Sequence, residues 1–238
     1  MEEWHYHPAD DLDDTFVQRL KRFPREPDLL TYAVRSLAAI ILRGALRLCH
    51  RFEVIGRENL PKEGSFVLVA NHSSHLDALC LASAMPLRML HHTFPAAAAD
   101  YFFVSWPRLA AAVLLVNALP FHRQLHVRHS VALCRKLLEN PGNVLIIFPE
   151  GTRCTTGQIG PFRGGIGLLL AGTSIPVVPC YVEGAHAAWP KGKWLPRPRR
   201  VRLHIGTPRT YDHLTGKEAA RMVCEDLRST VGNLSKPS

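Results

Sequence analysis

Long apolar runs and a leader pattern are missing from this 238-residue sequence. A membrane-spanning helix needs about 18 or more consecutive apolar residues, and the longest candidate, 109–119, is too short. The first residues lack the basic-then-apolar layout of a secretory signal. We therefore expect neither a conventional transmembrane helix nor export.

Cysteine clusters are also missing. The closest pair of the six cysteines, Cys134 and Cys154, is 20 positions apart, whereas zinc motifs and disulfide-dense domains need closer spacing. Most of the cysteines have apolar neighbours, which favours buried free thiols in a reducing compartment. The six are Cys49, Cys80, Cys134, Cys154, Cys180 and Cys224.

Acidic residues are scarce outside the N-terminus. Residues 1–28 hold eight acids and four bases, and residues 29–238 hold 25 bases against 12 acids. Such a basic body favours anionic partners: nucleic acid, acidic lipid headgroups, phosphorylated substrates or an acidic carrier protein. Charge alone does not choose among them.

Three regions follow from this pattern. Residues 1–27 form an acidic N-terminal arm, 28–50 an amphipathic helix, and 51–238 the main domain. Apolar residues in 28–50 follow a helical period that arginines interrupt. This helix either packs on the domain or lies in a membrane interface with its arginines near headgroups.

Strands and helices alternate through the main domain. Continuously apolar segments, typical of buried strands, are followed by turns and helical patterns. We therefore predict an α/β fold with a largely parallel central sheet flanked by helices. The expected strands are 66–70, 144–148, 175–182 and 201–205, and the expected helices are 78–84, 131–139, 166–171 and 216–231.

The first candidate site is the turn after the strand 66–70. His72 and Asp77 are five residues apart, so His72 must precede the helix for the carboxylate to reach its Nδ1–H. Nε2 would then be left as a base. Two alternatives stay open at this stage. Asp77 could instead cap the helix with Ser74, or a metal could be bound by His72, His75, Asp77 and the pair His91–His92.

Two further turns carry candidate residues. Phe148-Pro149-Glu150-Gly151-Thr152-Arg153 follows a buried strand, where Gly151 permits close backbone approach and Arg153 offers a fork for phosphate. Leu119-Pro120-Phe121-His122-Arg123 is a similar polar turn after an apolar run. Alone, each could be a sharp turn with a solvated arginine.

Together these motifs resemble those of the glycerolipid acyltransferase family, which includes 1-acylglycerol-3-phosphate acyltransferases. Asn71–Asp77 matches its His-then-four-then-Asp motif, and Phe148–Arg153 matches its Phe-Pro-Glu-Gly-Thr-Arg motif. Phe121–Arg123 is similar to the motif between them, and Ile175–Pro179 is similar to the fourth, with Pro179 as the fixed point. The order and approximate spacing agree over residues 50–210.

The resemblance implies a glycerol-3-phosphate acyltransferase-like fold. It also implies a catalytic pair in which His72 is the general base and Asp77 orients it. Arg123 and Arg153 would hold the phosphate of the acceptor, and Glu150 and Gly151 would shape the site beside it. The matching motifs add Thr152 and Pro179 to the substrate-binding set. His122, where the family usually has Asp, Ser or an apolar residue, leaves the acceptor's identity open.

The expected reaction moves a fatty acyl group from acyl-CoA or acyl carrier protein to the hydroxyl of a lysophospholipid. The favoured acceptor is 1-acylglycerol 3-phosphate. Glycerol 3-phosphate or a lyso-aminolipid is the alternative acceptor, and a metal-dependent hydrolase using His72, His75 and Asp77 is the alternative of another class. No serine or cysteine lies in a recognisable nucleophile elbow, so direct attack by the acceptor is the simpler route. We expect no resident metal or cofactor.

A basic cluster with interleaved tryptophans lies near the C-terminal end of the sequence. Such a cluster can bind nucleic acid, bind lipid headgroups or simply form a solvent-exposed surface. The resemblance favours headgroups, so we expect no nucleic-acid partner and a peripheral position on the cytoplasmic face of a membrane. The cluster comprises Trp189, Lys191, Lys193, Trp194, Arg197, Arg199, Arg200 and Arg202.

Overall fold

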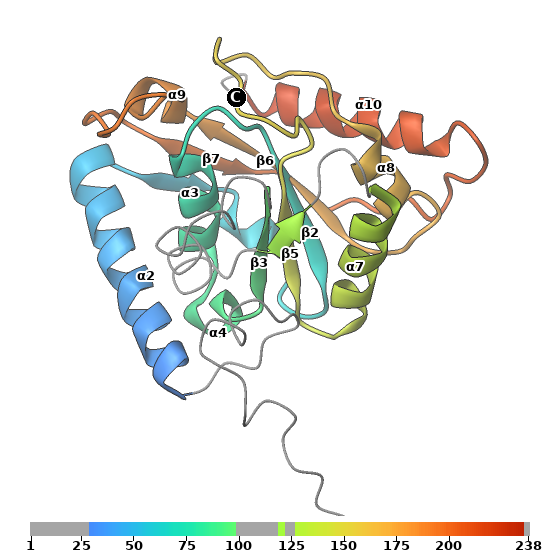
Figure 1. Ribbon diagram of the computed structural model, residues 1–238, viewed down its shortest axis with the longest axis horizontal. Coiled ribbons are helices and arrows are strands. Elements are labelled where there is room, and N and C mark those ends of the chain that lie inside the picture. The colour runs from blue at the N-terminus through green and yellow to red at the C-terminus, as the bar shows by residue number, and fades with distance from the viewer. Residues whose placement is uncertain (1–28, 99–118, 122–126, 236–238) are drawn as a thin grey trace, which may run out of the picture.

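The computed structural model describes residues 29–98, 119–121 and 127–235. A seven-stranded sheet with the order β1-β7-β6-β2-β5-β3-β4 forms its centre (Figure 1). The strands are β1 (Glu53–Ile55), β2 (Phe66–Ala70), β3 (Thr93–Ala98), β4 (Leu119–Phe121), β5 (Val144–Ile147), β6 (Val177–Glu183) and β7 (Arg202–Ile205).

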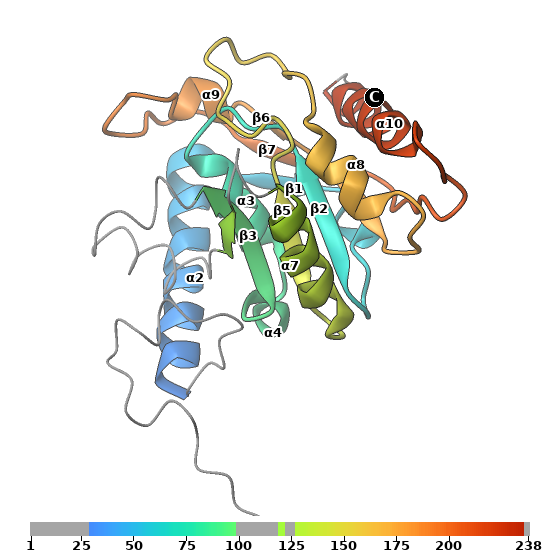
Figure 2. The ribbon, with the colours of Figure 1, turned by 45° about the vertical axis from the view of Figure 1, so that its right-hand side comes forward.

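Helices cover both faces of this sheet (Figure 2). The helices α2, α3 and α4 lie on one side, and α7, α8 and α10 lie on the other. The helices are α2 (Leu29–His50), α3 (Leu76–Ala84), α4 (Leu87–Leu90), α7 (Val127–Glu139), α8 (Gly164–Leu170), α9 (Ala185–Ala188) and α10 (Ala219–Asn233), and a 3₁₀ turn, η1, spans Arg57–Asn59.

The central strand β2 shows why the apolar run at 66–70 folds as it does. All five of its residues are buried. Phe66 and Leu68 pack in the core cluster shared with α3, whereas Val67 and Val69 pack in the cluster shared with α7, α8 and α10. A strand with helices on both faces needs apolar side chains at every position.

The predicted α/β class is confirmed, including the largely parallel sheet. Strands β6, β2, β5, β3 and β4 pair in parallel, while β7 pairs antiparallel with β6 and parallel with β1. The expected strand at 201–205 is present as β7, and its residues alternate between half-buried and buried. The acidic arm at 1–27 lies outside the described residues.

The predicted helix at 28–50 is present as α2, and it buries only a narrow face. Ala39 and Leu46 are buried against the domain. Three larger apolar side chains stand in solvent, with exposed fractions of 60% for Leu37, 63% for Ile41 and 85% for Leu48. Among the described residues, no helix combines the length and hydropathy that crossing a bilayer requires. The exposed apolar face therefore has no partner within the described part of the chain.

The cysteine prediction is largely confirmed. Cys80, Cys134, Cys180 and Cys224 are buried, Cys154 is half-buried, and Cys49 is exposed, which the sequence did not indicate. Burial raises the pKa of the Cys134 thiol to about 12. This buried thiol is therefore neutral at physiological pH and acts as a small apolar side chain.

Candidate active site

Two parallel strands bring the first two motifs together. Strands β2 and β5 are neighbours, with Val69 opposite Ile147, so the turns that follow them leave the same edge of the sheet. His72 follows β2 and Phe148 follows β5. The imidazole of His72 stacks on the Phe148 ring with a centroid separation of 4.2 Å. The carboxyl ends of parallel strands are where α/β proteins commonly build sites.

The predicted contact between His72 and Asp77 is present. Nδ1 of His72 lies 2.9 Å from Oδ2 of Asp77. The Asp77 side chain is fully buried, whereas 21% of the His72 side chain is exposed. Because the carboxylate accepts the Nδ1–H, the lone pair is on Nε2. Within the described residues Nε2 forms no hydrogen bond, so the imidazole can act as a base toward a bound molecule.

The capping alternative for Asp77 also describes a real contact. Oδ2 of Asp77 accepts hydrogen bonds from the backbone N–H groups of Ser73 at 2.6 Å and Ser74 at 2.8 Å. The carboxylate thus fixes the turn that carries His72 as well as the imidazole itself. Its two roles reinforce each other, since the turn and the ring are held by the same oxygen.

Glu150 ties the second motif to the first. One carboxylate oxygen accepts the backbone N–H of His72 at 2.7 Å, and the other accepts that of Gly160 at 3.0 Å. A further bond runs from the backbone N–H of Cys154 to the carbonyl of His72 at 2.7 Å. Burial raises the pKa of Glu150, and the two backbone hydrogen bonds oppose that rise. With both oxygens engaged, Glu150 holds the position of His72.

Gly151 is required by the backbone. Its φ is +72°, and a Cβ there would lie 2.6 Å from Nε of Arg163, which donates to the carbonyl of Glu150 at 3.2 Å. Only glycine adopts such a φ without cost and leaves this space open. The glycine therefore allows the chain to turn directly after Glu150.

Arg153 contacts the turn that carries His72. Its guanidinium donates to Nε2 of His75, whose ring lies 4.9 Å from that of Trp189. Burial lowers the pKa of His75, and the positive charge of Arg153 lowers it further. A neutral His75 accepts the Arg153 hydrogen bond and orients its guanidinium. A positive charge is thus held against His75, three residues after His72.

The other predicted substrate-binding residues are dispersed. Thr152 is exposed at the turn. Pro179 is buried within β6, opposite Val69 of β2, so it lies in the sheet beneath the site. Phe121 ends β4, but His122 and Arg123 lie outside the described residues, and the role of Arg123 stays a prediction.

The histidines of the metal alternative do not gather. His75 contacts Arg153, and His91 lies under α2, where its ring stacks on Tyr32 at 3.7 Å. His92 is exposed. In the described ranges, no three His, Cys, Asp or Glu side chains are grouped as ligands for a metal ion. Metal analysis of the purified protein would test this alternative directly.

Sequence reasoning missed three residues of this site. The Phe148 ring supports His72, Gly160 holds the second oxygen of Glu150, and Trp189 covers His75. The Trp189 carbonyl also accepts the Ser74 hydroxyl at 2.8 Å. Position in the Phe-Pro-Glu-Gly motif could have indicated Phe148. No spacing signal leads to Gly160 or Trp189, because tertiary folding brings them in.

A comparison with protein families covers both turns of the candidate site. A model of the family described as Acyltransferase matches residues 51–183, which is more than half of the chain. The chain belongs to this family. The resemblance to glycerolipid acyltransferases is thereby confirmed, and the matched residues include the His72 turn and the Glu150 turn.

The curated relatives of this chain share one name. The 1-acyl-sn-glycerol-3-phosphate acyltransferase of Bacillus subtilis is 27% identical over 207 residues, covering 85% of this chain and 95% of the relative. A chloroplastic protein of the same name from Brassica napus is 29% identical over 187 residues, covering 76% of this chain. The aligned part is 50% of that relative, so the chain spans about half of its length.

A solved structure supports the fold. The crystal structure of the 1-acyl-sn-glycerophosphate acyltransferase PlsC from Thermotoga maritima superposes with a TM-score of 0.66 and 23% sequence identity. The superposition covers 87% of this chain and 82% of that one. The similarity bears on the architecture of the sheet and its helices.

Proposed function

We propose that this protein transfers a fatty acyl group from a thioester, acyl-CoA or acyl carrier protein, to the free hydroxyl of 1-acylglycerol 3-phosphate. The observation that carries the proposal is the His72–Asp77 contact at 2.9 Å beside Arg153. The names of the relatives point to the same acceptor. A phosphorylated alcohol needs a base to take the proton of its hydroxyl and a cation to bind its phosphate, and this site offers an imidazole and a nearby guanidinium.

The mechanism follows from these positions. Nε2 of His72 removes the proton of the acceptor hydroxyl as its oxygen attacks the thioester carbon. Asp77, fully buried, stabilises the imidazolium that forms. Collapse of the tetrahedral intermediate breaks the carbon–sulfur bond, and the imidazolium returns its proton to the departing thiolate. The products are the acylated lipid and a free thiol, and no acyl-enzyme is needed.

An acceptor panel tests the proposal. Purified protein is given labelled acyl-CoA or acyl carrier protein with lysophosphatidate, glycerol 3-phosphate or lysophosphatidylethanolamine, and kcat/KM is compared. We expect the highest value with lysophosphatidate. A clear preference for glycerol 3-phosphate or for the lyso-aminolipid would replace the proposed acceptor, and hydrolysis alone would indicate the hydrolase alternative.

Arg153 should affect the acceptor more than the donor. We expect Arg153→Ala to lower kcat/KM for lysophosphatidate by about 10- to 150-fold, because one charge-assisted phosphate hydrogen bond contributes about 1.5–3 kcal/mol. Steady-state kinetics with each substrate varied in turn gives the two KM values. Arg221→Gln, at an exposed position on α10, is the control. An Arg153→Ala enzyme with an unchanged acceptor KM would show that the phosphate binds elsewhere.

We also propose that the protein attaches peripherally to a membrane through α2. The support is the exposed apolar face, where Ile40 is 54% and Ile41 is 63% exposed. The net charge of +9 favours anionic headgroups. The relatives act on lipid acceptors according to their names, so a surface position gives access to substrate.

Replacing Ile40 and Ile41 with aspartate should release the protein from vesicles. Two charges would then face hydrocarbon, and burying a charge is costly. High salt should release the wild type only partly, because it screens charge but leaves apolar burial intact. Liposome sedimentation measures both effects, and an unchanged unfolding curve verifies the fold. A wild type that binds no vesicle, anionic or neutral, would contradict the proposal.

A further inference from the structure

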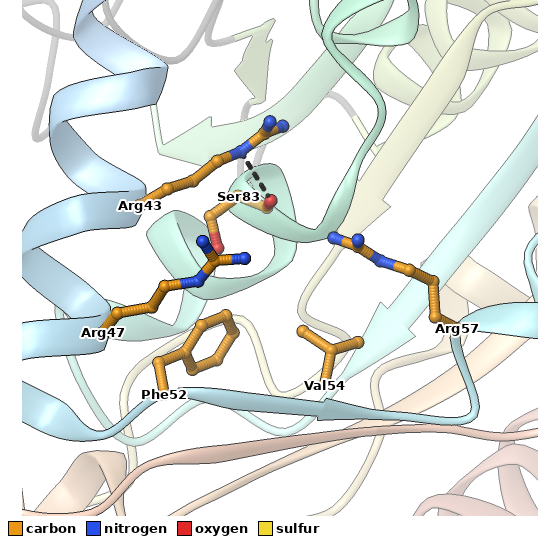
Figure 3. A pocket seen from close by; sticks show the side chains of 6 residues that line it. All are labelled: Arg43, Arg47, Phe52, Val54, Arg57 and Ser83. Atoms are coloured by element: carbon orange, nitrogen blue, oxygen red, sulfur yellow. Dashed lines mark hydrogen bonds between the residues drawn. The ribbon is translucent and has the colours of Figure 1, made fainter.

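A cavity of about 240 Å³ lies at the other end of α3 from the catalytic pair. Three of its lining side chains are arginines: Arg43 and Arg47 from α2, and Arg57 from η1 (Figure 3). Their guanidinium groups reach toward the last turn of α3 from two sides. Phe52, Val54 and Ser83 complete the lining.

Two of these arginines are held in place by the end of α3. Nε of Arg43 donates to the carbonyl of Ser83 at 3.0 Å, and Nη2 of Arg57 donates to the carbonyl of Ala84 at 3.0 Å. Arg43 also donates to the carbonyl of Met85. These bonds preorganise the cavity, because the guanidinium planes are fixed before any ligand arrives. Arg47 forms no hydrogen bond or ion pair with the described residues.

The cavity has excess positive charge. None of its lining residues is acidic, and in the described ranges no carboxylate pairs with the three arginines. The carbonyls at the end of a helix supply only about half a negative charge. The pKa of Arg43 is lowered by burial and then by the charges of Arg57 and Arg47. About 2.5 positive charges therefore remain to be balanced, which suits a phosphate monoester carrying about −1.5 to −2.

The position on α2 indicates where such a phosphate comes from. By helical geometry, Arg43 and Arg47 lie between the buried side of α2 at Ala39 and Leu46 and its exposed apolar side at Ile40. A lipid whose chains lie along the exposed side places its headgroup at this boundary.

The cavity is separate from the acceptor's phosphate site. Asp77 lies in the first turn of α3 and Ser83 near its last residue, and six residues of helix rise about 9 Å. In lysophosphatidate only a few covalent bonds separate the phosphate from the reacting hydroxyl. A molecule reacting at His72 therefore cannot place its phosphate among these arginines.

We propose that Arg43, Arg47 and Arg57 form a second lipid site, which binds the phosphomonoester headgroup of a membrane lipid such as phosphatidate. This inference rests on the proposed attachment through α2 but not on the catalytic proposal. The site would concentrate the protein on membranes rich in the lipid class that its proposed reaction consumes and makes.

The test compares two kinds of vesicle of equal surface charge. One is phosphatidylcholine with about one-fifth phosphatidate, and the other is phosphatidylcholine with enough phosphatidylglycerol, a phosphodiester, to match it. We expect the wild type to bind phosphatidate vesicles about tenfold more tightly, and Arg47→Gln/Arg57→Gln to lose that preference. The control Arg88→Gln/Arg221→Gln removes the same charge at exposed positions and should weaken binding to both vesicles alike.

Two arms separate this site from the active site. Repeating the comparison in the Arg153→Ala background weakens phosphate binding at the active site, and the preference should persist there. Acyl transfer with coenzyme A thioesters, which carry a soluble phosphomonoester, should give an unchanged donor KM in Arg47→Gln/Arg57→Gln.

Three results would overturn the proposal: a preference that survives in Arg47→Gln/Arg57→Gln, one that the control loses equally, or a donor KM that rises tenfold while vesicle selectivity stays. The last would assign the cavity to the acyl donor. Because vesicle binding is measured without catalysis, failure of the acyltransferase proposal leaves this result readable, and failure here leaves the acyltransferase proposal standing.

Discussion

His72→Ala should lower kcat/KM for acyl transfer by about 100- to 10,000-fold, because a positioned general base contributes that much. The loss should appear in kcat rather than in the acceptor KM, since the imidazole acts on the proton that moves in the transition state. Radiolabelled acyl transfer to lysophosphatidate measures both.

The fold should survive this change. The His72 side chain is 21% exposed, and its backbone N–H, which Glu150 accepts, remains in alanine. Vesicle binding and the unfolding curve should therefore match the wild type. His213→Ala, at a histidine with 67% of its side chain exposed, is the control and should keep full activity. Wild-type turnover by His72→Ala would remove His72 from the mechanism.

Asp77→Asn should lower kcat by up to about 10,000-fold, the order seen when the carboxylate of a catalytic triad becomes an amide. The asparagine oxygen can take the place of Oδ2 and keep the bonds to the N–H groups of Ser73 and Ser74. The turn is thus preserved, but the neutral amide cannot stabilise the imidazolium.

A purely structural role for Asp77 predicts a different result. If Asp77 only capped the turn, Asp77→Asn would keep its turnover, because the oxygen that accepts the two backbone bonds is retained. Asp226→Asn, which removes a carboxylate that binds Arg209 and Tyr211 rather than His72, controls for a generic loss of charge. Equal kcat values for Asp77→Asn and the wild type would leave only the capping role.

Much of the fold was predictable because burial leaves a local pattern. The uninterrupted apolar run at 66–70 is β2, and the run at 144–148 contains β5, which ends at Ile147. The reversal of β1 and β7 was not predictable, since the alternation of Leu203 and Ile205 with polar residues fits either strand direction. The connection between β6 and β7, residues 184–201, is long enough for either direction.

The contacts of the candidate site were also predictable only where the residues are close in sequence. His72 and Asp77 are close in sequence, so their spacing allowed the contact, while a capping role for Asp77 and a metal site stayed open and the resemblance favoured the pair. The bridge from Glu150 to Gly160 and the cover of Trp189 over His75 depend on tertiary contacts between distant segments. The sequence left open whether the helix at 28–50 packs on the domain or lies in a membrane interface. In the structure α2 buries Ala39 and Leu46 against the domain and leaves Leu37 and Leu48 exposed, so its larger apolar face stays available for the proposed membrane contact.

Thiol release with and without the acceptor tests direct acyl transfer most simply. Purified protein is mixed with acyl-CoA, and the free thiol is followed alongside labelled ester, first without acceptor and then with lysophosphatidate. Direct attack assisted by His72 predicts little thiol without the alcohol, and one thiol for each ester once it is added, with no acyl group left on the protein. Rapid thiol release without acceptor, or an acylated protein after quenching, would contradict the account.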